Sequence, residues 1–278
     1  MVSELLEHGR KKLSQASFSP PRREANLLLG HVLGLSEAQI LARSTEEVSE
    51  SASQRFIELL GRRVEGEPVA YLLGHREFYG RNFRVDSRVL IPRPETEHLV
   101  ETVLALPLPR YPKILDLGTG SGCLAATFAA ELGDASIVAV DRSPGALELA
   151  AVNLRALGQS ARVRLLASDL AQSLALESFD IVVSNPPYIG HEERAGLSPE
   201  VRDFEPHQAL FPPGAADSMI ARLITESSSL RSGAFLVFEI SHRQSDRVRN
   251  LLERSAFELE RLVEDYQGIP RIVVARRR

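Results

Sequence analysis

Hydrophobic and polar residues follow two different patterns along the chain, and the change falls near residue 74. In residues 1–73 the apolar positions recur at the three- and four-residue spacing of amphipathic helices. Pro21 is well placed to begin one helix and Gly34 to end another segment. This pattern predicts a small all-α helical-bundle domain over residues 1–73. Such a bundle either caps the structure or docks a partner protein.

The segment after the bundle is predicted to connect two domains. Its sequence GHREFYGRNFRV alternates about a Gly-containing turn, which is typical of a β-hairpin. The following LIPRPETE places two prolines around Arg93, so an extended segment should lead into a helix. We therefore expect a β-hairpin connector over residues 74–93. Arg93 either binds an anionic ligand or pairs with Glu95 or Glu97, and the spacing slightly favours the pairing.

The remainder, residues 94–278, alternates short apolar runs with longer amphipathic ones. The predicted strands are 114–117, 137–140, 163–167, 179–183, 234–240, 258–263 and 271–275, and the predicted helices are 124–132, 144–157, 215–230 and 244–255. Strands that alternate with helices in this way favour an α/β fold, a doubly wound and mostly parallel sheet with helices on both faces. The stretch between residue 188 and about 215 is predicted to be a long loop.

Composition narrows the classes of protein that this chain can be. Its 278 residues are 44% hydrophobic, which is enough for substantial cores, and the net charge of −4 argues against direct nucleic-acid binding. The single cysteine, Cys123, excludes an internal disulfide and a cysteine-based zinc site, and we expect no metal. The start resembles no signal peptide and no apolar run has membrane-spanning length. A cytoplasmic protein without membrane contact is expected.

A glycine-rich turn after the first strand of the α/β region indicates a cofactor site. Gly118, Gly120 and Gly122 would let the backbone approach a ligand, and Asp141 ends the next strand, where an acid can bind ribose hydroxyls. The spacing GTGSG lacks the G-x-G-x-x-G pattern that binds a pyrophosphate. A nucleoside cofactor without phosphates is therefore more probable than a dinucleotide.

Further acids suggest which nucleoside it is. Asp116, just before the glycines, can take the ammonium of an amino-acid group, which points to S-adenosyl-L-methionine. Asp169, after the third strand, would meet the adenine amino group while Leu170 packs on the ring. The candidate cofactor-binding residues are Asp116, Gly118, Thr119, Gly120, Ser121, Gly122, Asp141, Asp169, Leu170 and Asn185.

The stretch Ser-Asn-Pro-Pro-Tyr at the end of the fourth strand carries the candidate chemistry. Asn185 offers a side-chain carbonyl, Pro186 offers a backbone carbonyl, and Tyr188 offers an aromatic face. Two acceptors beside a flat platform suit a planar group that bears an NH₂. Hydrogen bonds from both N–H groups would hold this poor nucleophile toward an electrophile. The alternative is a proline-rich turn without chemistry.

Taken together, these motifs resemble class I S-adenosylmethionine-dependent methyltransferases, and more narrowly the release factor glutamine N5-methyltransferases (PrmC/HemK family). The resemblance rests on GHREF, LIPRPETE, DLGTGSGCLA, AVDRSPGALELAAVN, FDIVVSNPPYI and the later EP..AL. It implies transfer of a methyl group to the glutamine of the Gly-Gly-Gln motif in class 1 peptide chain release factors. The implied catalytic residues are Asn185, Pro186 and Tyr188, and the implied substrate-binding residues add Pro187 and Arg93.

Two departures and two other hypotheses accompany this resemblance. Residues 211–217 are richer in proline than the family pattern, and Ser241 stands where a glycine is usual. NPPY also occurs in methyltransferases of base amino groups, so an adenine N6 methyltransferase on DNA or RNA is an alternative function. A non-catalytic module that docks to translation proteins is the other.

Overall fold

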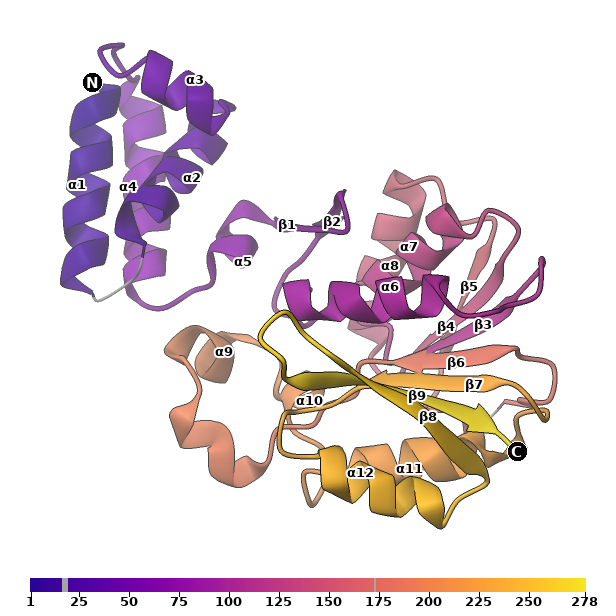
Figure 1. The fold of residues 1–278 in the computed structure, drawn as a ribbon. Helices are drawn as coiled ribbons and strands as arrows, with labels where there is room; N and C mark the ends of the chain where they lie inside the picture. The colour runs from indigo at the N-terminus through magenta and orange to yellow at the C-terminus, as the bar shows by residue number, and fades with distance from the viewer. Residues whose placement is uncertain (17–19, 173) are drawn as a thin grey trace. The chain divides into compact units, whose positions relative to one another are not determined.

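The chain folds into two compact units. A computed structural model describes residues 1–16, 20–172 and 174–278 (Figure 1). Unit 1 comprises Met1–His75 with Ser198–Phe204, and unit 2 comprises Arg76–Leu197 with Glu205–Arg278. The sequence prediction assigned residues 198–204 to the C-terminal domain, whereas the structure groups them with the N-terminal helices.

Unit 1 is helical, as the apolar spacing predicts. Its helices are α1 (Val2–Gln15), α2 (Pro21–Leu33), α3 (Glu37–Ala42), α4 (Glu50–Val64), α5 (Val69–Leu73) and α9 (Pro199–Phe204). Leu13, Leu28 and Phe56 are fully buried between them. Pro21 is the first residue of α2, and Gly34 caps that helix at a φ of 67°, in the left-handed region that favours glycine.

A buried arginine holds part of unit 1 together. The Arg63 side chain is 2% exposed, and its guanidinium donates two hydrogen bonds to Glu24, at 2.8 and 2.9 Å. A second acid, Glu200 of α9, lies 3.1 Å from Nη1 of Arg63. This ion cluster accounts for the placement of α9, because a buried guanidinium requires acidic partners.

Unit 2 is built on a seven-stranded sheet with the order β5-β4-β3-β6-β7-β9-β8. The strands are β3 (Lys113–Leu117), β4 (Ser136–Asp141), β5 (Val163–Ala167), β6 (Ile181–Ser184), β7 (Phe235–Glu239), β8 (Phe257–Glu264) and β9 (Pro270–Arg277). The five from β5 to β7 run parallel, and β9 and β8 are antiparallel. The mostly parallel sheet is thus confirmed. The predicted hairpin is also present, as β1 (His75–Phe78) and β2 (Arg81–Arg84).

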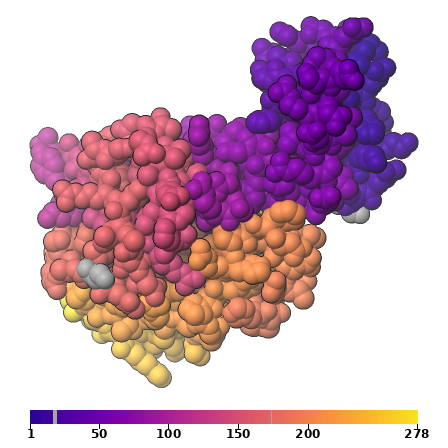
Figure 2. All heavy atoms as spheres, turned by 180° about the vertical axis from the view of Figure 1, so that it is seen from behind, coloured from indigo at the N-terminus to yellow at the C-terminus, as the bar shows by residue number. Residues whose placement is uncertain are grey.

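Helices cover both faces of this sheet (Figure 1). Side chains of α6 (Glu97–Leu104), α7 (Cys123–Glu131) and α8 (Pro144–Ala156) share one apolar core with alternate strand residues. Those of α11 (Ser218–Glu226) and α12 (Ser245–Glu253) share the core on the other face. Figure 2 shows the atoms of unit 2 packed as one continuous body, with the yellow C-terminal segment at its lower edge. Both faces of the central parallel strands β3, β6 and β7 are therefore buried, whereas the edge strand β5 is largely exposed.

The remaining helices are short. The segment predicted as a loop after residue 188 contains η2 (His191–Gly196), α9 and α10 (His207–Leu210), while η1 (Pro94–Thr96) and η3 (Ser227–Ser229) adjoin α6 and α11. Elements of four to six residues are too short to repeat an apolar face, so the loop prediction was wrong here. Within the residues that the structure describes, no helix combines the length and the apolar character needed to cross a bilayer.

Candidate active site

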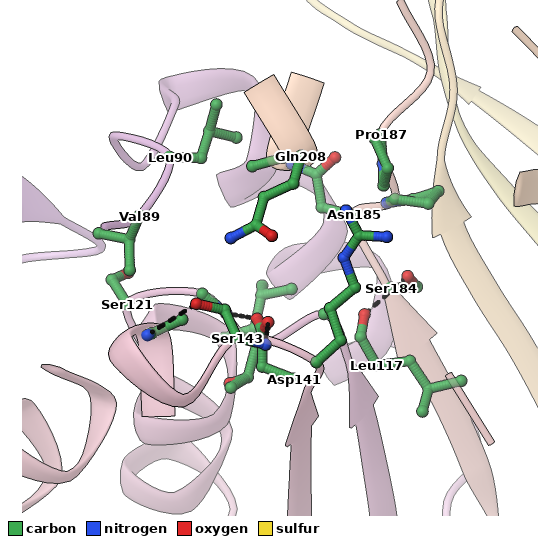
Figure 3. A pocket seen from close by; sticks show the side chains of 18 of the residues that line it. Val89, Leu90, Leu117, Ser121, Asp141, Ser143, Ser184, Asn185, Pro187 and Gln208 are labelled. Atoms are coloured by element: carbon green, nitrogen blue, oxygen red, sulfur yellow. Dashed lines mark hydrogen bonds between the residues drawn. The ribbon is translucent and has the colours of Figure 1, made fainter. Parts of the chain in front are cut away.

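A pocket opens to solvent at the carboxyl ends of the parallel strands, and its empty space together with the open solvent at its mouth is about 1000 Å³. Leu117 ends β3, Asp141 ends β4, Ser168 follows β5 and Ser184 ends β6, and all four line the pocket (Figure 3). These strands are neighbours in the sheet, so their last residues meet at one edge. In an open α/β sheet this edge is where ligands bind.

Most of the predicted site residues meet in this pocket. The lining includes Arg93, Gly118, Thr119, Gly120, Ser121, Asp141, Asp169, Leu170, Asn185, Pro186 and Pro187. It does not include Asp116, Gly122 or Tyr188. The structure thus brings the candidate cofactor loop and the NPPY loop together and places three predicted residues behind or beside the cavity.

The glycine loop is fixed by its own backbone. The amides of Gly118 and Thr119 both donate to the carbonyl of Val140 at 2.8 Å. Gly122 has a φ of +78°, and a Cβ atom built on it would lie 3.1 Å from Cβ of Ala150 in α8. Only glycine meets both conditions, so Gly122 shapes the turn from behind without facing the cavity.

Asp141 braces the loop and still faces the pocket. Its Oδ2 accepts from the amide of Gly120 at 2.9 Å, and its Oδ1 accepts from the amide of Ser143 at 2.9 Å (Figure 3). A carboxylate oxygen has two acceptor positions, so each oxygen can take one further donor. This arrangement fits the vicinal hydroxyl groups of a ribose.

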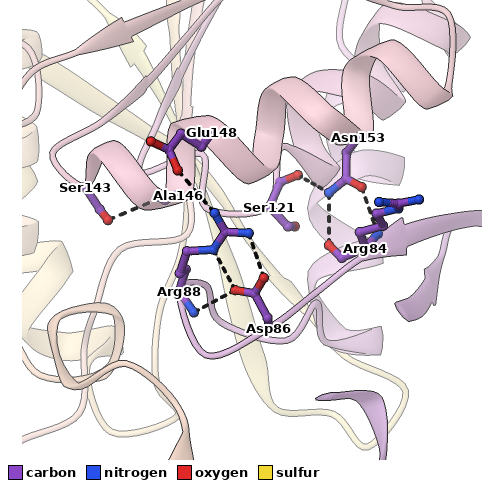
Figure 4. A network of polar contacts seen from close by, with 8 residues as sticks. All are labelled: Arg84, Asp86, Arg88, Ser121, Ser143, Ala146, Glu148 and Asn153. Atoms are coloured by element: carbon purple, nitrogen blue, oxygen red, sulfur yellow. Dashed lines mark hydrogen bonds and ion pairs between the residues drawn. The ribbon is translucent and has the colours of Figure 1, made fainter. Parts of the chain in front are cut away.

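Asn153 of α8 is a positioning residue that sequence reasoning missed. Its Nδ2 donates to the carbonyls of Ser121, at 2.8 Å, and Arg84, at 3.0 Å. Its Oδ1 accepts from the amide of Arg84 at 2.8 Å, as Figure 4 shows. One side chain therefore ties the glycine loop to the end of β2. The signal in the sequence was a polar residue among the apolar positions of a predicted helix.

Asp116 lies beneath the loop, fully buried. Its Oδ2 accepts from the Thr119 hydroxyl at 2.7 Å, whereas its Oδ1 is buried without a hydrogen-bond partner. Burial raises the pKa of this carboxyl to about 7, opposed by the Thr119 hydroxyl and reinforced by the charge of Asp141. An acid in this state fits a ligand that brings a cation or an N–H donor to the loop.

The raised pKa of Asp116 predicts that the free energy of unfolding of the protein without ligand depends on pH. Because the pKa of Asp116 is about 7 in the folded protein and its ordinary value is 3.8, the free energy of unfolding should fall as pH rises between these values. Asp116→Asn keeps the acceptor for Thr119 without the charge. We expect the variant to be more stable at pH 8, by at most about 4 kcal/mol, and equally stable near pH 4.

Urea denaturation of both proteins at several pH values measures this difference. Subtracting the two curves removes the contribution of all other titrating groups. Equal pH dependence in the two proteins would show that Asp116 titrates at its ordinary pKa.

Asp169 and Leu170 lie at the end of the pocket that follows β5. Arg222 pairs with Asp169 at 3.2 Å and with Glu226 at 2.9 Å. Leu170 has a φ of 51°, a left-handed conformation that is costly for a leucine, and the Glu226 carboxylate accepts from the next amide, that of Ala171, at 3.0 Å. This strained backbone and the largely buried Leu170 side chain offer a defined contact for a flat ring.

Arg93 lines the pocket and forms an ion pair with Glu205, whose side chain is 1% exposed. The other oxygen of Glu205 accepts from the amide of Ile91 at 3.2 Å. The pairing of Arg93 with Glu95 or Glu97, favoured from the sequence, is replaced by this pair. Spacing alone suggested the nearby acids, but the buried Glu205 lies 112 residues away. Arg93 is therefore held at the pocket by an acid of the EP..AL motif.

Asn185 is held by two residues that the sequence analysis did not identify. Its Nδ2 donates to Oγ1 of Thr96 at 3.0 Å, and the Thr96 hydroxyl donates to Oε2 of Glu239 at 2.8 Å. The Tyr188 hydroxyl donates to the other oxygen of Glu239, at 2.9 Å. Glu239 is an acid at the carboxyl end of a buried strand, which is the same signal that identified Asp141.

Tyr188 faces away from the main pocket. It lines a second hollow with Ala216, Asp217 and Ser241, which belong to the two departures from the family pattern. The two departures are joined by Gln244, which accepts from the amide of Ser241 at 2.9 Å and donates to the carbonyl of Ala216 at 3.0 Å. Both departures lie outside the lining of the main pocket.

Comparisons of the sequence with known proteins give one consistent result. Residues 4–74 match the model of the PrmC N-terminal domain, and residues 95–199 match that of the methyltransferase small domain. A release factor glutamine methyltransferase of Nitratidesulfovibrio vulgaris is 40% identical over 98% of this chain and 94% of its own length. One of Neisseria gonorrhoeae is 42% identical over 92% and 93%.

Solved structures share the fold of the α/β unit. A methyltransferase from Pyrococcus furiosus superposes with a TM-score of 0.52 at 16% identity, over 78% of this chain and 96% of that one. The T. thermophilus 16S rRNA methyltransferase RsmC, in complex with AdoMet and guanosine, has a TM-score of 0.50 at 18% identity, over 73% and 50%. At these identities the likeness concerns the fold alone.

Proposed function

Because this chain belongs to the family of release factor glutamine methyltransferases, we propose that it methylates the side-chain amide nitrogen of a glutamine in a peptide chain release factor. Its cofactor is S-adenosyl-L-methionine. The observation that carries the proposal in the structure is the NPPY loop beside the glycine loop in one pocket, with Asn185 oriented by Thr96. The acceptor we propose is the glutamine of the Gly-Gly-Gln motif in class 1 release factors.

The pocket residues fit this cofactor. The buried Oδ1 of Asp116 lacks a partner, and an ammonium group at the loop would supply a positive charge near it. Asp141 has free acceptor positions for ribose hydroxyls. Leu170 offers an apolar contact for adenine, and Asp169 offers an acceptor for its amino group. When bound, S-adenosylmethionine supplies an electrophilic methyl group.

The residues of the NPPY loop would bind and orient the acceptor amide. Since Nδ2 of Asn185 is committed to Thr96, its Oδ1 is available as an acceptor. The backbone carbonyl of Pro186 is the second acceptor, and the following Pro187 has no N–H. Two N–H donors of a glutamine side chain match these two acceptors. Held in this way, the nitrogen lone pair points out of the amide plane.

Positioning is the main catalytic contribution in this proposal. The amide nitrogen would form one bond to the methyl carbon while the bond between that carbon and the cofactor sulfur breaks, with its electron pair staying on sulfur. The nitrogen then loses one proton, so a primary amide becomes an N-methyl amide, and the demethylated cofactor and one proton are released. A nitrogen that becomes positive sheds this proton readily to water, and the mechanism needs no strong base. Holding two reactants in line can lower a barrier by roughly 7–11 kcal/mol at best.

The helical unit is proposed to dock the release factor away from the reactive glutamine. Residues 4–74 match the N-terminal domain model of this family, so the unit is part of the family architecture. A tripeptide offers little surface for discrimination among proteins, whereas a separate docking unit offers more. We propose a cytoplasmic location, where translation termination takes place, and no direct contact with nucleic acid.

An adenine methyltransferase is not favoured. NPPY alone is compatible with a base amino group, but the full-length relatives are named for a release factor glutamine. The net charge of −4 also gives little attraction for a phosphate backbone.

A transfer assay with labelled S-adenosylmethionine tests the proposal. The acceptors are a purified class 1 release factor, the same factor with its Gly-Gly-Gln glutamine changed to alanine, and adenine-containing DNA and RNA. We expect label on the intact factor and on no other acceptor. Label on nucleic acid, or equal label on both forms of the factor, would contradict the proposed function.

A further inference from the structure

The donors and acceptors of the hydrogen bonds behind Asn185 determine the orientation of its side-chain amide. A threonine hydroxyl has one proton to donate and lone pairs to accept with. Thr96 is 3% exposed, and its proton is used in the 2.8 Å bond to Glu239 Oε2 because a carboxylate can only accept. Toward Asn185, therefore, Thr96 can only accept. The Nδ2 atom of Asn185 must lie on this side, at 3.0 Å, and the Oδ1 atom on the other.

Glu239 is suited to impose this direction. It is 2% exposed, and its two oxygens accept from Thr96 and from Tyr188, at 2.8 and 2.9 Å. Burial raises the pKa of the Glu239 carboxyl, whereas these two hydrogen bonds and the charge of Arg271 lower it and favour the ionised form. Burial raises the pKa of the Tyr188 hydroxyl well above 10, and the charge of Glu239 raises it further, so Tyr188 remains a donor. Both bonds thus run toward the carboxylate.

We propose that Thr96 and Glu239 are positioning residues that fix the Asn185 amide with its oxygen toward the acceptor and so select a side chain that donates N–H groups. This inference rests on the proposed function. It predicts that the site binds a glutamine side chain in preference to a glutamate, since a carboxylate would meet the Asn185 oxygen without a proton between them. Neither residue needs to touch the reacting nitrogen for this role.

Thr96→Val removes the hydroxyl and keeps the shape of the side chain. The Asn185 amide then loses the hydrogen bond that fixes its orientation. We expect kcat to fall by about 10-fold to 100-fold, as for a misplaced catalytic contact. The dissociation constant of S-adenosylmethionine should stay within about 2-fold of the wild-type value, because Thr96 is not among the residues proposed to hold the cofactor. Thr96→Ser restores a hydroxyl and should recover most of the activity.

Selectivity gives a readout that a merely structural role would not change. A release factor with glutamate in place of the reactive glutamine is used as a competitive inhibitor. For each enzyme, the inhibition constant of the glutamate form is divided by the dissociation constant of the glutamine form. We expect this ratio to be lower for Thr96→Val and Glu239→Gln than for the wild type. In Glu239→Gln the new side-chain amide can donate a hydrogen bond to the Thr96 hydroxyl. That hydroxyl can then donate its own proton to Oδ1 of Asn185, which would turn the Asn185 amide the other way.

Thr127→Val is the matched control, since Thr127 is buried in α7 and its hydroxyl has no hydrogen-bond partner. It should change neither kcat nor selectivity. The inference is overturned if the wild type methylates the factor and Thr96→Val does so at the same rate with the same selectivity. It is also overturned if Thr96→Ser fails to recover activity. A wild type that labels no release factor would instead refute the proposed function.

Discussion

Replacing Asn185 by alanine should lower kcat by about 10²-fold to 10³-fold, which is the loss measured when one preorganised hydrogen bond is removed from an active site. The variant loses the acceptor that orients the substrate amide, while the glycine loop and Asp141 are untouched. The affinity for S-adenosylmethionine should therefore change little. Single-turnover transfer to a release factor and calorimetric titration of the cofactor measure the two quantities.

The matched control is Asn250→Ala, which makes the same change on the exposed face of α12. That variant should transfer methyl groups at the wild-type rate. Full activity of Asn185→Ala would remove Asn185 from the site, whereas loss of cofactor binding together with transfer would reassign it to the cofactor pocket.

Asp141→Ala should weaken S-adenosylmethionine binding by roughly 10-fold to 100-fold, since a hydrogen bond to a charged group contributes about 1.5–3 kcal/mol. The loss has two causes. The variant has no acceptor for the ribose hydroxyls, and the amides of Gly120 and Ser143 lose their partner in the loop. Calorimetry at constant pH gives the dissociation constant directly.

An acid outside the pocket serves as the control for Asp141. Asp134 lies in the turn after α7, where its exposed side chain is 3.9 Å from Arg110. Asp134→Ala should bind the cofactor as the wild type does. Unchanged binding in Asp141→Ala would place the nucleoside elsewhere in the pocket.

The overall fold could be predicted because its signals are local. Apolar runs of strand length alternate with helical spacing from residue 113 onward, and each strand that lines the pocket ends in, or is directly followed by, a polar or glycine residue. Parallel pairing then brings Leu117, Asp141 and Ser184 to one edge. Spacing within a few residues was enough for this part of the site.

The partners of the site residues could not be predicted, because they come from distant parts of the chain. Thr96 and Glu239 are 143 residues apart, and Arg93 and Glu205 are 112 apart. A single sequence shows acids and hydroxyls at these positions but not which of them meet. The local alternative, Glu95 or Glu97 for Arg93, was preferred for that reason and was wrong.

The placement of Asp116 and Tyr188 also depends on three-dimensional packing. The sequence puts Asp116 beside the glycines, but the side chain of a strand residue points to one face of the sheet, and here it is covered by the loop. Tyr188 follows two prolines that turn the chain, so its hydroxyl reaches Glu239 instead of the main pocket. Both roles in ligand binding remain predictions.

We propose that the NPPY loop directs a methyl group to a glutamine side-chain nitrogen of a release factor. Tandem mass spectrometry of a release factor after incubation with S-adenosylmethionine and this enzyme locates the methyl group. We expect one added methyl group on the side chain of the Gly-Gly-Gln glutamine with the wild type, and almost none with Asn185→Ala. A methyl group on any other residue, or an equal yield from Asn185→Ala, would contradict it.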